Sequence, residues 1–238
     1  MAFERFRENK LDLTQRYQSI EELKANPPQC DLCITGSDQV FNPNRISADR
    51  QAYYLSFMPI ETPKASYAAS FGVKDVPIDK VDEIASYLSR FSYLSVREES
   101  GAKIIESLTR NKPLVVLDPV FLLSREKWLS YEIRRPGLPD NYVLLYSVMG
   151  TEYSDKVASE VAQQLKLPLI VITTGVLFRA KADLIIRDAT PQEFINIFNG
   201  AEYIVTDSFH GTAFSLIFNK QFILANNIEI KRDRPVSL

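Results

Sequence analysis

The chain has 238 residues, of which 45% are hydrophobic and 24% are charged, which is the balance of an ordinary globular protein with a sizeable core. Its 28 lysines and arginines against 30 aspartates and glutamates give a net charge of -2, which excludes a general electrostatic attraction to nucleic acid. The start, MAFERFRENK, is too polar for a signal peptide, and no run of about 18 apolar residues follows. We therefore expect a cytoplasmic protein without a transmembrane segment.

Apolar runs alternate with helical patterns along the chain, which predicts an α/β fold built on parallel sheets. In the first half, the hydrophobic spacing predicts helices over 13–25, 79–90 and 98–108, and a short helix that Ser124 caps and that ends at Tyr131. Strands are predicted over 31–35, 65–69, 93–96 and 114–117.

The segment 134–140, RRPGLPD, is predicted to be a linker because it holds two prolines and a glycine. It divides the chain into lobes over 1–135 and 136–238. In the second lobe, the predicted strands are 142–148, 169–173, 184–186, 203–206 and 222–225, and the predicted helices are 153–165, 191–200 and 211–218. The helix after Thr190 has a capping box with Glu193. The pattern predicts two Rossmann-like lobes in series.

Ligands of open parallel sheets bind at the carboxyl ends of strands, and the segment YIVTDSFHGTAFS offers the strongest candidate there. It contains His210, the only histidine of the chain, whose ordinary pKa lies near neutrality. A helix start beside it would direct backbone N–H groups towards an anion. We take His210 and Asp207 as candidate catalytic residues, and a local capping or packing role for His210 stays open. Candidate substrate-binding residues in the same segment are Ser208, Gly211 and Thr212.

Arg97, in YLSVREESG, lies between a predicted strand and a predicted helix. A guanidinium there can form two parallel hydrogen bonds to a carboxylate or a phosphate. The alternative is an ion pair with Glu98 or Glu99. Arg97 is the third candidate catalytic residue.

Two further strand ends offer polar groups. In ITGSDQVFNP the backbone could face a ligand, and the side chains could bind hydroxyls; the candidates are Gly36, Ser37, Asp38, Gln39 and Asn42. In SYAASFG the candidates are Ser70 and Gly72. A tight turn and core packing are the respective alternatives, and Asp118 either caps a turn or joins the site.

Several cofactors are not expected. No Walker loop and no dinucleotide-binding G-x-G-x-x-G pattern are present, so neither NAD nor FAD is expected. Cys30 and Cys33 form one C-x-x-C pair without a second pair, which favours structural thiols over zinc. No resident metal or cofactor is therefore predicted.

Taken together, these segments resemble the polysaccharide pyruvyl transferase family. The matching pieces are GSDQVFNP, SYAASFG, LSVREESG, VVLDPVFLL, TDSFHGTAFS and FNKQF, in the family's order. The resemblance implies two Rossmann-like lobes like those of GT-B glycosyltransferases. It also implies transfer of a pyruvyl group from phosphoenolpyruvate to a sugar of an exopolysaccharide or its lipid-linked precursor, as a ketal. His210 and Arg97 match the family's histidine and arginine.

The implied mechanism gives each candidate a role. Arg97 and the helix start near His210 hold the anionic groups of phosphoenolpyruvate, and the two residues converge on this donor from different lobes. His210 protonates the methylene carbon or holds the leaving phosphate, and Asp207 or Asp38 orients or deprotonates the sugar hydroxyl. Lipid-linked acceptors imply peripheral contact with the inner membrane face, and the oligomeric state is left open.

The chain departs from the family pattern in two places. Many members carry an arginine where this chain has Ser208, so either the cation comes from Arg97, Arg179 or Lys181 or the chemistry has changed. Members also begin with a strand and a glycine-containing loop ahead of the present start, so the first lobe is expected to be incomplete. Two alternative functions stay open: a nucleotide-sugar glycosyltransferase and a non-catalytic relative of the same fold.

Overall fold

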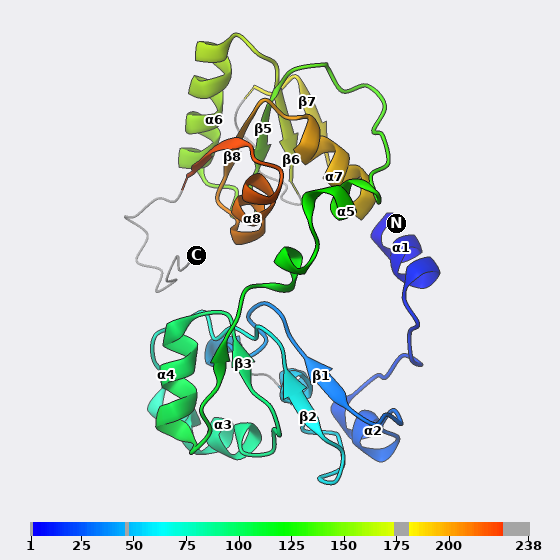
Figure 1. The fold of residues 1–238 in the computed structure, drawn as a ribbon, viewed down its shortest axis with the longest axis vertical. Coiled ribbons are helices and arrows are strands. Elements are labelled where there is room, and N and C mark those ends of the chain that lie inside the picture. The colour runs from blue at the N-terminus through cyan, green and yellow to red at the C-terminus, as the bar shows by residue number, and fades with distance from the viewer. Residues whose placement is uncertain (1, 46–47, 174–180, 226–238) are drawn as a thin grey trace. The chain divides into compact units, whose positions relative to one another are not determined.

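The computed structural model describes residues 2–45, 48–173 and 181–225, which divide into two compact units (Figure 1). The N-terminal unit contains residues 14–119. The C-terminal unit contains the described residues from 120 onwards, together with residues 2–13 and their helix α1 (Ala2–Lys10). Each unit has its own parallel strands and its own hydrophobic core, and each is described by itself below.

The N-terminal unit is built on short parallel strands. Its paired strands are β1 (Cys33–Thr35) with β2 (Lys64–Ser66), and β3 (Ser95–Val96) with β4 (Leu114–Val115). Isolated bridges from Ala65 to Tyr93 and from Ala69 to Val96 connect the two pairs. The helices are α2 (Ile20–Ala25), α3 (Val81–Leu88) and α4 (Glu99–Leu108), with 3-10 helices η1 (Pro43–Arg45), η2 (Ala48–Tyr54) and η3 (Ile78–Lys80).

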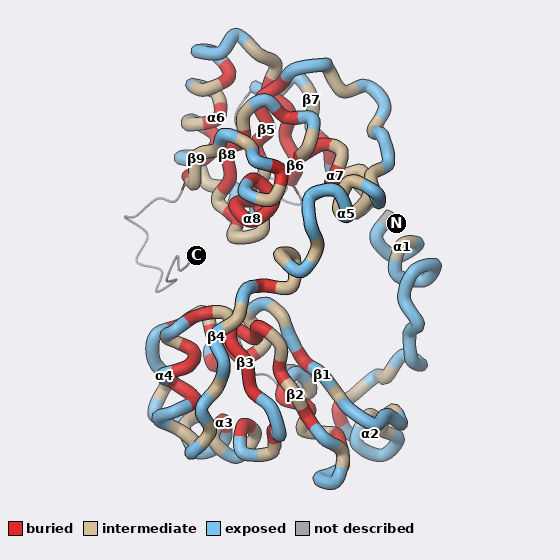
Figure 2. Tube along the Cα trace, viewed as in Figure 1, coloured by how far each residue is buried: buried red, intermediate tan, exposed pale blue. Residues whose placement is uncertain are grey.

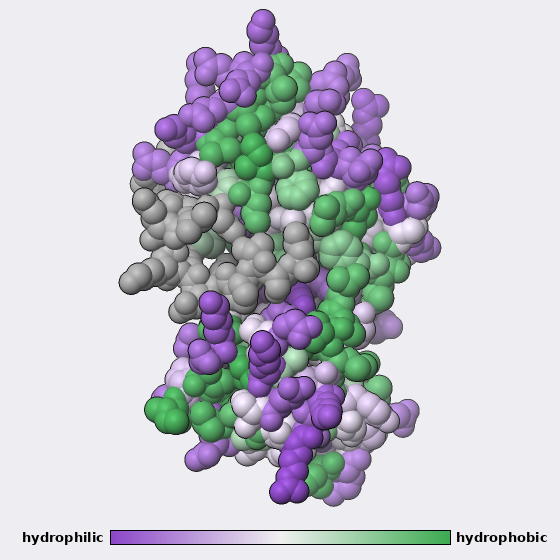
Figure 3. Space-filling model, turned by 60° about the vertical axis from the view of Figure 1, so that its left-hand side comes forward, coloured by the Kyte–Doolittle hydropathy of each residue, from purple (hydrophilic) through white to green (hydrophobic). Residues whose placement is uncertain are grey.

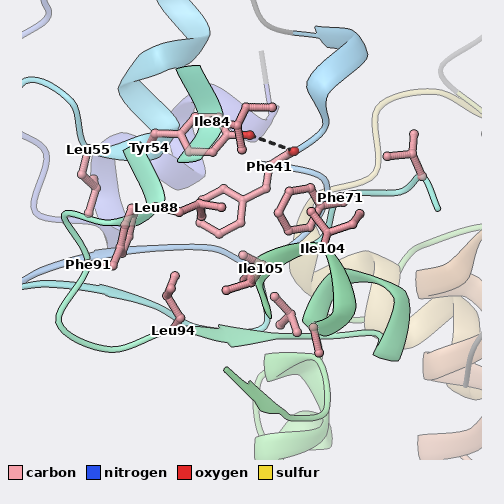
Figure 4. Close-up of a cluster of buried hydrophobic side chains, with 14 of the residues drawn as sticks. Phe41, Tyr54, Leu55, Phe71, Ile84, Leu88, Phe91, Leu94, Ile104 and Ile105 are labelled. Atoms are coloured by element: carbon pink, nitrogen blue, oxygen red, sulfur yellow. Dashed lines mark hydrogen bonds between the residues drawn. The ribbon is translucent and has the colours of Figure 1, made fainter. Parts of the chain in front are cut away.

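Aromatic side chains form the centre of the N-terminal core (Figure 4). The Phe41 ring stacks on the Tyr54 ring with centroids 4.8 Å apart, and it meets Phe71 at 5.5 Å. The Tyr54 hydroxyl donates a hydrogen bond of 2.9 Å to the Phe41 carbonyl. This bond satisfies the one polar atom that Tyr54 brings into the core.

Only one face of the N-terminal sheet packs against this core. Ile34 pairs with Ala65 and Ala65 with Tyr93, so these side chains share a face of the sheet. Ile34 and Tyr93 are exposed, whereas Leu94 and Val96 point the other way and enter the core. Figure 2 colours the trace of each unit by burial. Exposed apolar side chains are also visible among hydrophilic ones on the face of the molecule drawn in Figure 3.

The C-terminal unit has a five-stranded parallel sheet in the order β7-β6-β5-β8-β9. Its strands are β5 (Val143–Tyr146), β6 (Leu169–Ile172), β7 (Leu184–Ile186), β8 (Tyr203–Thr206) and β9 (Gln221–Leu224). Its helices are α5 (Arg125–Leu129), α6 (Glu152–Leu165), α7 (Pro191–Gly200) and α8 (Phe209–Ile217), and η4 (Pro119–Leu122) leads into the unit. The strand order reverses between β5 and β8, which is the switch point of a doubly wound sheet.

Helices cover both faces of this sheet. Along β5, Val143 and Leu145 enter one hydrophobic cluster and Leu144 enters another. Ala158 of α6 belongs to the first cluster and Phe214 of α8 to the second. Burial of both faces explains why β5 and β6 are almost continuously apolar rather than alternating.

Most predicted elements are confirmed, including the capping box of α7, where Thr190 accepts from the Glu193 amide and the Glu193 carboxylate accepts from Thr190. The helix predicted over 13–25 is wrong in its first part, because the helix begins only at Ile20. Ser19 accepts from the Glu22 amide, and the Glu22 carboxylate accepts from the Gln18 amide, which sets this start. Helix α1 (Ala2–Lys10) is not among the elements predicted from the sequence.

The boundary between the units lies at Pro119 and Val120, ahead of the proline-containing segment 134–140. The Trp128 indole donates to the Val120 carbonyl and its ring meets Phe214 at 5.1 Å, which ties residues 120–129 to the C-terminal unit. Within the described residues, no helix combines the length and the apolar character needed to cross a membrane.

Candidate functional site

Polar side chains from three strand ends meet around Arg97 in the N-terminal unit. Arg97 follows β3, and its Nη1 atom donates to Asp118 Oδ2 at 2.9 Å and its Nη2 atom to Asp38 Oδ1 at 3.2 Å. Ser37, after β1, donates from Oγ to the same Asp118 oxygen at 2.6 Å. We call these four residues the Arg97 cluster. It lies where an open parallel sheet binds its ligands.

The carboxylates of the Arg97 cluster differ in exposure. The Asp118 side chain is 1% exposed and that of Arg97 is 10% exposed, whereas that of Asp38 is 66% exposed. A buried charge pair is costly to break, because removal of one partner leaves the other charge uncompensated. An exposed pair contributes little, since water competes for both charges.

Glu98 adds a third carboxylate beside Arg97. Its Oε1 atom accepts from the Phe71 amide at 2.9 Å, and its Oε2 atom lies 4.0 Å from Arg97 Nε. The predicted ion pair with Glu98 is therefore only marginal, and the stronger partners are Asp38 and Asp118. Of the two roles left open for Asp118 in the sequence, the structure shows a place beside Arg97, while Asp118 as the ion-pair partner of Arg97 was not predicted.

The other predicted residues of this lobe mainly hold the loop after β1. The Asn42 amide donates to Gln39 Oε1 at 3.1 Å, and Ser70 is buried with its amide donating to the Asp38 carbonyl at 2.8 Å. Gly72 has a φ of 64°, and a Cβ atom there would lie 2.5 Å from Gln39 Cδ. Gly36, with a φ of 124°, packs against Tyr67. These contacts favour a structural role for Gln39, Asn42 and both glycines.

In the C-terminal unit, Asp207 organises the loop that follows β5. Its Oδ2 atom accepts from Ser147 Oγ at 2.6 Å and from the Met149 amide at 3.2 Å, and its Oδ1 atom accepts from the Val148 amide at 2.8 Å. Both oxygens of this predicted catalytic residue thus bind the protein itself. These contacts favour a loop-holding role for the Asp207 carboxylate.

His210 lies in the first turn of α8, at the carboxyl end of β8 and beside the switch point. Its ring meets the Phe209 ring edge-on at 5.3 Å, and the side chain is half-buried. The helix begins after Ser208, whose amide donates to Thr206 Oγ1 at 3.1 Å. Predicted from residue 211, the helix starts two residues earlier, so His210 is part of its first turn rather than of the preceding loop.

Gly211 allows α8 to approach the sheet closely. A Cβ atom on Gly211 would lie 2.9 Å from both Tyr146 Cδ1 and Thr206 Cβ, well inside van der Waals contact. Thr212 is buried, and its hydroxyl donates to the Ser208 carbonyl at 3.2 Å. Gly211 and Thr212 therefore serve packing in this structure.

Burial changes the acidity of two groups near the candidate sites. It raises the pKa of the Tyr146 hydroxyl, and the negative charge of Asp207 raises it further. Burial, followed by the influence of Cys30, raises the pKa of the Cys33 thiol to about 11, which favours the neutral thiol at physiological pH. Over the described part of the chain, no group of three or more potential metal ligands is present.

Arg97 and His210 lie in different units, and their predicted convergence on one donor stays a prediction. Of the other cations that could replace the family's arginine, Lys181 is exposed in the C-terminal unit. Arg179 lies outside the described residues.

The fold and the strand-end sites define the class as an α/β protein of two Rossmann-like lobes in series, the fold class of GT-B enzymes. The UDP-GlcNAc 2-epimerase of Methanocaldococcus jannaschii, in complex with UDP-GlcNAc and UDP, is similar at a TM-score of 0.54 and 16% identity, over 91% of this chain and 70% of that one. The UDP-GlcNAc 2-epimerase of Neisseria meningitidis, bound to UDP-GlcNAc, is similar at 0.55 and 14%, over 94% of this chain and 69% of that one.

A match to a protein-family model identifies the family within this fold class. The model described as polysaccharide pyruvyl transferase matches residues 2–227, and the chain belongs to this family. No curated protein matches the chain.

Proposed function

We propose that the chain transfers a pyruvyl group from phosphoenolpyruvate to a sugar of a cell-surface polysaccharide or its lipid-linked precursor, with formation of a ketal. Family membership supports pyruvyl transfer in general. The observation that carries the proposal is the place of His210. This half-buried imidazole lies in the first turn of α8, at the carboxyl end of β8 in a doubly wound sheet.

The proposed reaction moves one proton to carbon and replaces phosphate by two sugar oxygens. Protonation of the methylene carbon of phosphoenolpyruvate gives a methyl group and an oxocarbenium-like centre at C2. One sugar hydroxyl bonds to C2, the C2–O bond to phosphate breaks, and a second hydroxyl closes the ketal. The two hydroxyl protons balance the proton taken up by the carbon and the proton acquired by the released phosphate or solvent.

His210 and Arg97 have the principal roles in this proposal. Protonated His210 is the acid that protonates carbon or the cation that holds the leaving phosphate. Arg97 binds a carboxylate or phosphate of the donor, since its guanidinium can form two parallel hydrogen bonds. We assign Asp207 to holding the loop after β5, because Ser147, Val148 and Met149 already donate to its carboxylate.

The test compares His210→Ala with His210→Gln in phosphate release from phosphoenolpyruvate, with a panel of methyl hexosides as acceptors. Both variants are expected to lose transfer, with unchanged far-UV circular dichroism. Retained binding of phosphoenolpyruvate by His210→Gln alone would support the acid role, because glutamine can donate a hydrogen bond but is not a general acid near neutral pH. Turnover at the wild-type rate by His210→Ala would rule out a catalytic His210.

A nucleotide-sugar transferase is the second candidate, favoured by the likeness in fold to proteins bound to UDP-GlcNAc. A ligand that binds only the folded protein raises its stability by about 2.7 kcal/mol at a hundredfold excess over Kd. Melting curves with phosphoenolpyruvate or UDP-GlcNAc therefore separate the candidates. A shift of about 5 °C or more with phosphoenolpyruvate alone supports pyruvyl transfer, and a shift with UDP-GlcNAc alone supports the second candidate.

A further inference from the structure

Two carboxylates of very different burial bind the same guanidinium in the Arg97 cluster. Asp118 is almost inaccessible and holds Nη1, while Asp38 is two-thirds exposed and holds Nη2. The two contacts occupy different nitrogens of the planar guanidinium. One side of Arg97 is therefore fixed from within, and the other is bound by a side chain in contact with solvent.

The hydrogen bond between Arg97 and Asp118 is buried and hard to replace. The same Oδ2 atom accepts from Ser37 Oγ at 2.6 Å and from Arg97 at 2.9 Å. Loss of either donor would leave part of a buried carboxylate charge without compensation, which is costly. Asp118 and Ser37 thus determine where the guanidinium lies.

The hydrogen bond between Arg97 and Asp38 is exposed and can be replaced by a bond to a ligand. The backbone of Asp38 is held firmly, because its carbonyl accepts from the amides of Val40 and Ser70, both at 2.8 Å. Its carboxylate is exposed, so water competes for its contact with Arg97. An anion that forms two parallel hydrogen bonds with Arg97 can outcompete it.

We propose that Asp38 is a placeholder carboxylate on Arg97, which an incoming carboxylate or phosphate displaces, while Asp118 is the positioning residue that keeps Arg97 ready for that anion. The identification of the anion as phosphoenolpyruvate rests on the proposed function. The two aspartates then affect anion affinity in opposite directions: Asp38 competes with the ligand, and Asp118 prepares its site.

The experiment measures the Kd of phosphoenolpyruvate and of inorganic phosphate by isothermal titration calorimetry. Asp38→Asn is the suitable variant, because Asp38 has a φ of 64° and asparagine tolerates this left-handed conformation. We expect Asp38→Asn to tighten binding by about fivefold, the equivalent of an exposed ion pair. We expect Asp118→Asn to weaken it by about tenfold or more, because Arg97 loses its fixed partner.

The matched control is Asp188→Asn. Asp188 is 72% exposed and binds Arg135 Nη2 at 2.8 Å in the C-terminal unit, so its loss removes the same charge from a similar pair. A general effect of net charge would tighten binding in this variant as well, whereas the placeholder role predicts less than a twofold change. Ser37→Ala, which removes only the hydroxyl donor to Asp118, replaces Asp118→Asn if that variant does not fold, and it is expected to weaken binding.

The outcomes separate this inference from the proposed function. Weaker or unchanged anion binding by Asp38→Asn would overturn the placeholder role, as would failure of both the wild type and Asp38→Asn to bind either anion. Binding of phosphate but not of phosphoenolpyruvate, tightened by Asp38→Asn, would contradict the proposed donor while supporting the placeholder. Tighter binding by Asp118→Asn would overturn the positioning role.

Discussion

The two units satisfy the polar groups at their strand ends in opposite ways. In the C-terminal unit, Asp207 accepts from backbone amides and a buried serine, so the charge stabilises a loop. In the N-terminal unit, Arg97 is bound by side chains, one of them exposed. Backbone contacts of the first kind are hard to exchange, whereas side-chain contacts of the second kind can be exchanged for a ligand. The comparison favours a rigid frame around His210 and, at Arg97, a fixed guanidinium with one exchangeable contact.

The sheets show the same contrast. The C-terminal sheet has strands of three or four residues in a continuous ladder, with a hydrophobic cluster on each face. The N-terminal strands have two or three residues, and isolated bridges join their two pairs. We therefore expect packing changes near His210 to be costly and changes in the N-terminal unit to be better tolerated.

Gly211→Ala should have the largest effect and tests the rigidity of the C-terminal frame. The new Cβ atom would lie 2.9 Å from Tyr146 Cδ1 and Thr206 Cβ, and overpacking of this kind costs about 3 kcal/mol. Gly101→Ala in α4 is the matched variant in the N-terminal unit. Its Cβ atom would lie 3.3 Å from Glu98 Oε1, and the gain in helix propensity, about 1 kcal/mol, offsets the crowding.

Urea unfolding followed by circular dichroism measures both glycine variants. We expect the free energy of unfolding to fall by about 3 kcal/mol for Gly211→Ala and to change by less than about 1 kcal/mol for Gly101→Ala. Equal changes in the free energy of unfolding for the two variants would mean that α8 can shift. The contrast between a rigid C-terminal unit and an adaptable N-terminal unit would then be contradicted.

Asp207→Ala should have the next largest effect. It removes the acceptor of the Val148 and Met149 amides, and hydrogen bonds to a charged group contribute about 2 kcal/mol. Asp207→Asn keeps one acceptor oxygen and should cost less. Hydrogen exchange resolved by peptide should localise the faster exchange to residues 147–151. Unchanged exchange there, with loss of pyruvyl transfer, would return Asp207 to the catalytic residues.

Removal of the hydroxyl of a buried tyrosine should have the smallest effect on stability. This effect should be the same in the two units. Tyr54 donates to the Phe41 carbonyl at 2.9 Å in one unit, and Tyr142 donates to the Ile197 carbonyl at 2.7 Å in the other. Burial raises the pKa of both hydroxyls above the ordinary tyrosine value of about 10. The folded protein therefore holds these protons more tightly than the unfolded chain does.

It follows that this stabilisation is complete below about pH 10 and is lost as the pH rises above that value. Tyr54→Phe and Tyr142→Phe should each lower the free energy of unfolding by about 1 kcal/mol at pH 8 and reduce its decline above pH 10. The control is Tyr93→Phe, because Tyr93 is exposed. Urea titrations at pH 8 and above pH 10 measure the free energy of unfolding of each variant. A pH effect confined to one of the two variants would show that the cores are not equivalent.

Local patterns predicted most of the fold. The capping box of Thr190 and Glu193 and the apolar run of β8 depend on neighbouring residues, and both are confirmed. The start of α2 was not predicted, although Ser19 accepts from the Glu22 amide as an N-cap and the Glu22 carboxylate accepts from the Gln18 amide. The helix predicted over 13–25 included residues 13–19, which lie in an irregular segment between α1 and α2.

The partners within the candidate site could not be predicted in the same way. Arg97 and His210 are predicted site residues because each follows an apolar strand, and His210 is also the only histidine of the chain. The hydrogen bonds of Asp207 with Ser147 and of Arg97 with Asp38 join residues about 60 positions apart in the chain. Such contacts depend on which strands lie side by side, and hydrophobic periodicity does not contain the strand order.

Trp128 is the only tryptophan of the chain, and its position has a practical consequence. Its ring packs edge-on against Phe214, four residues after His210 on the same helix, and its indole nitrogen is bound to Val120 at the border of the units. The emission of one native fluorophore therefore reports on the helix that begins beside the candidate catalytic histidine. Rapid-mixing measurements can follow that signal in the unlabelled protein.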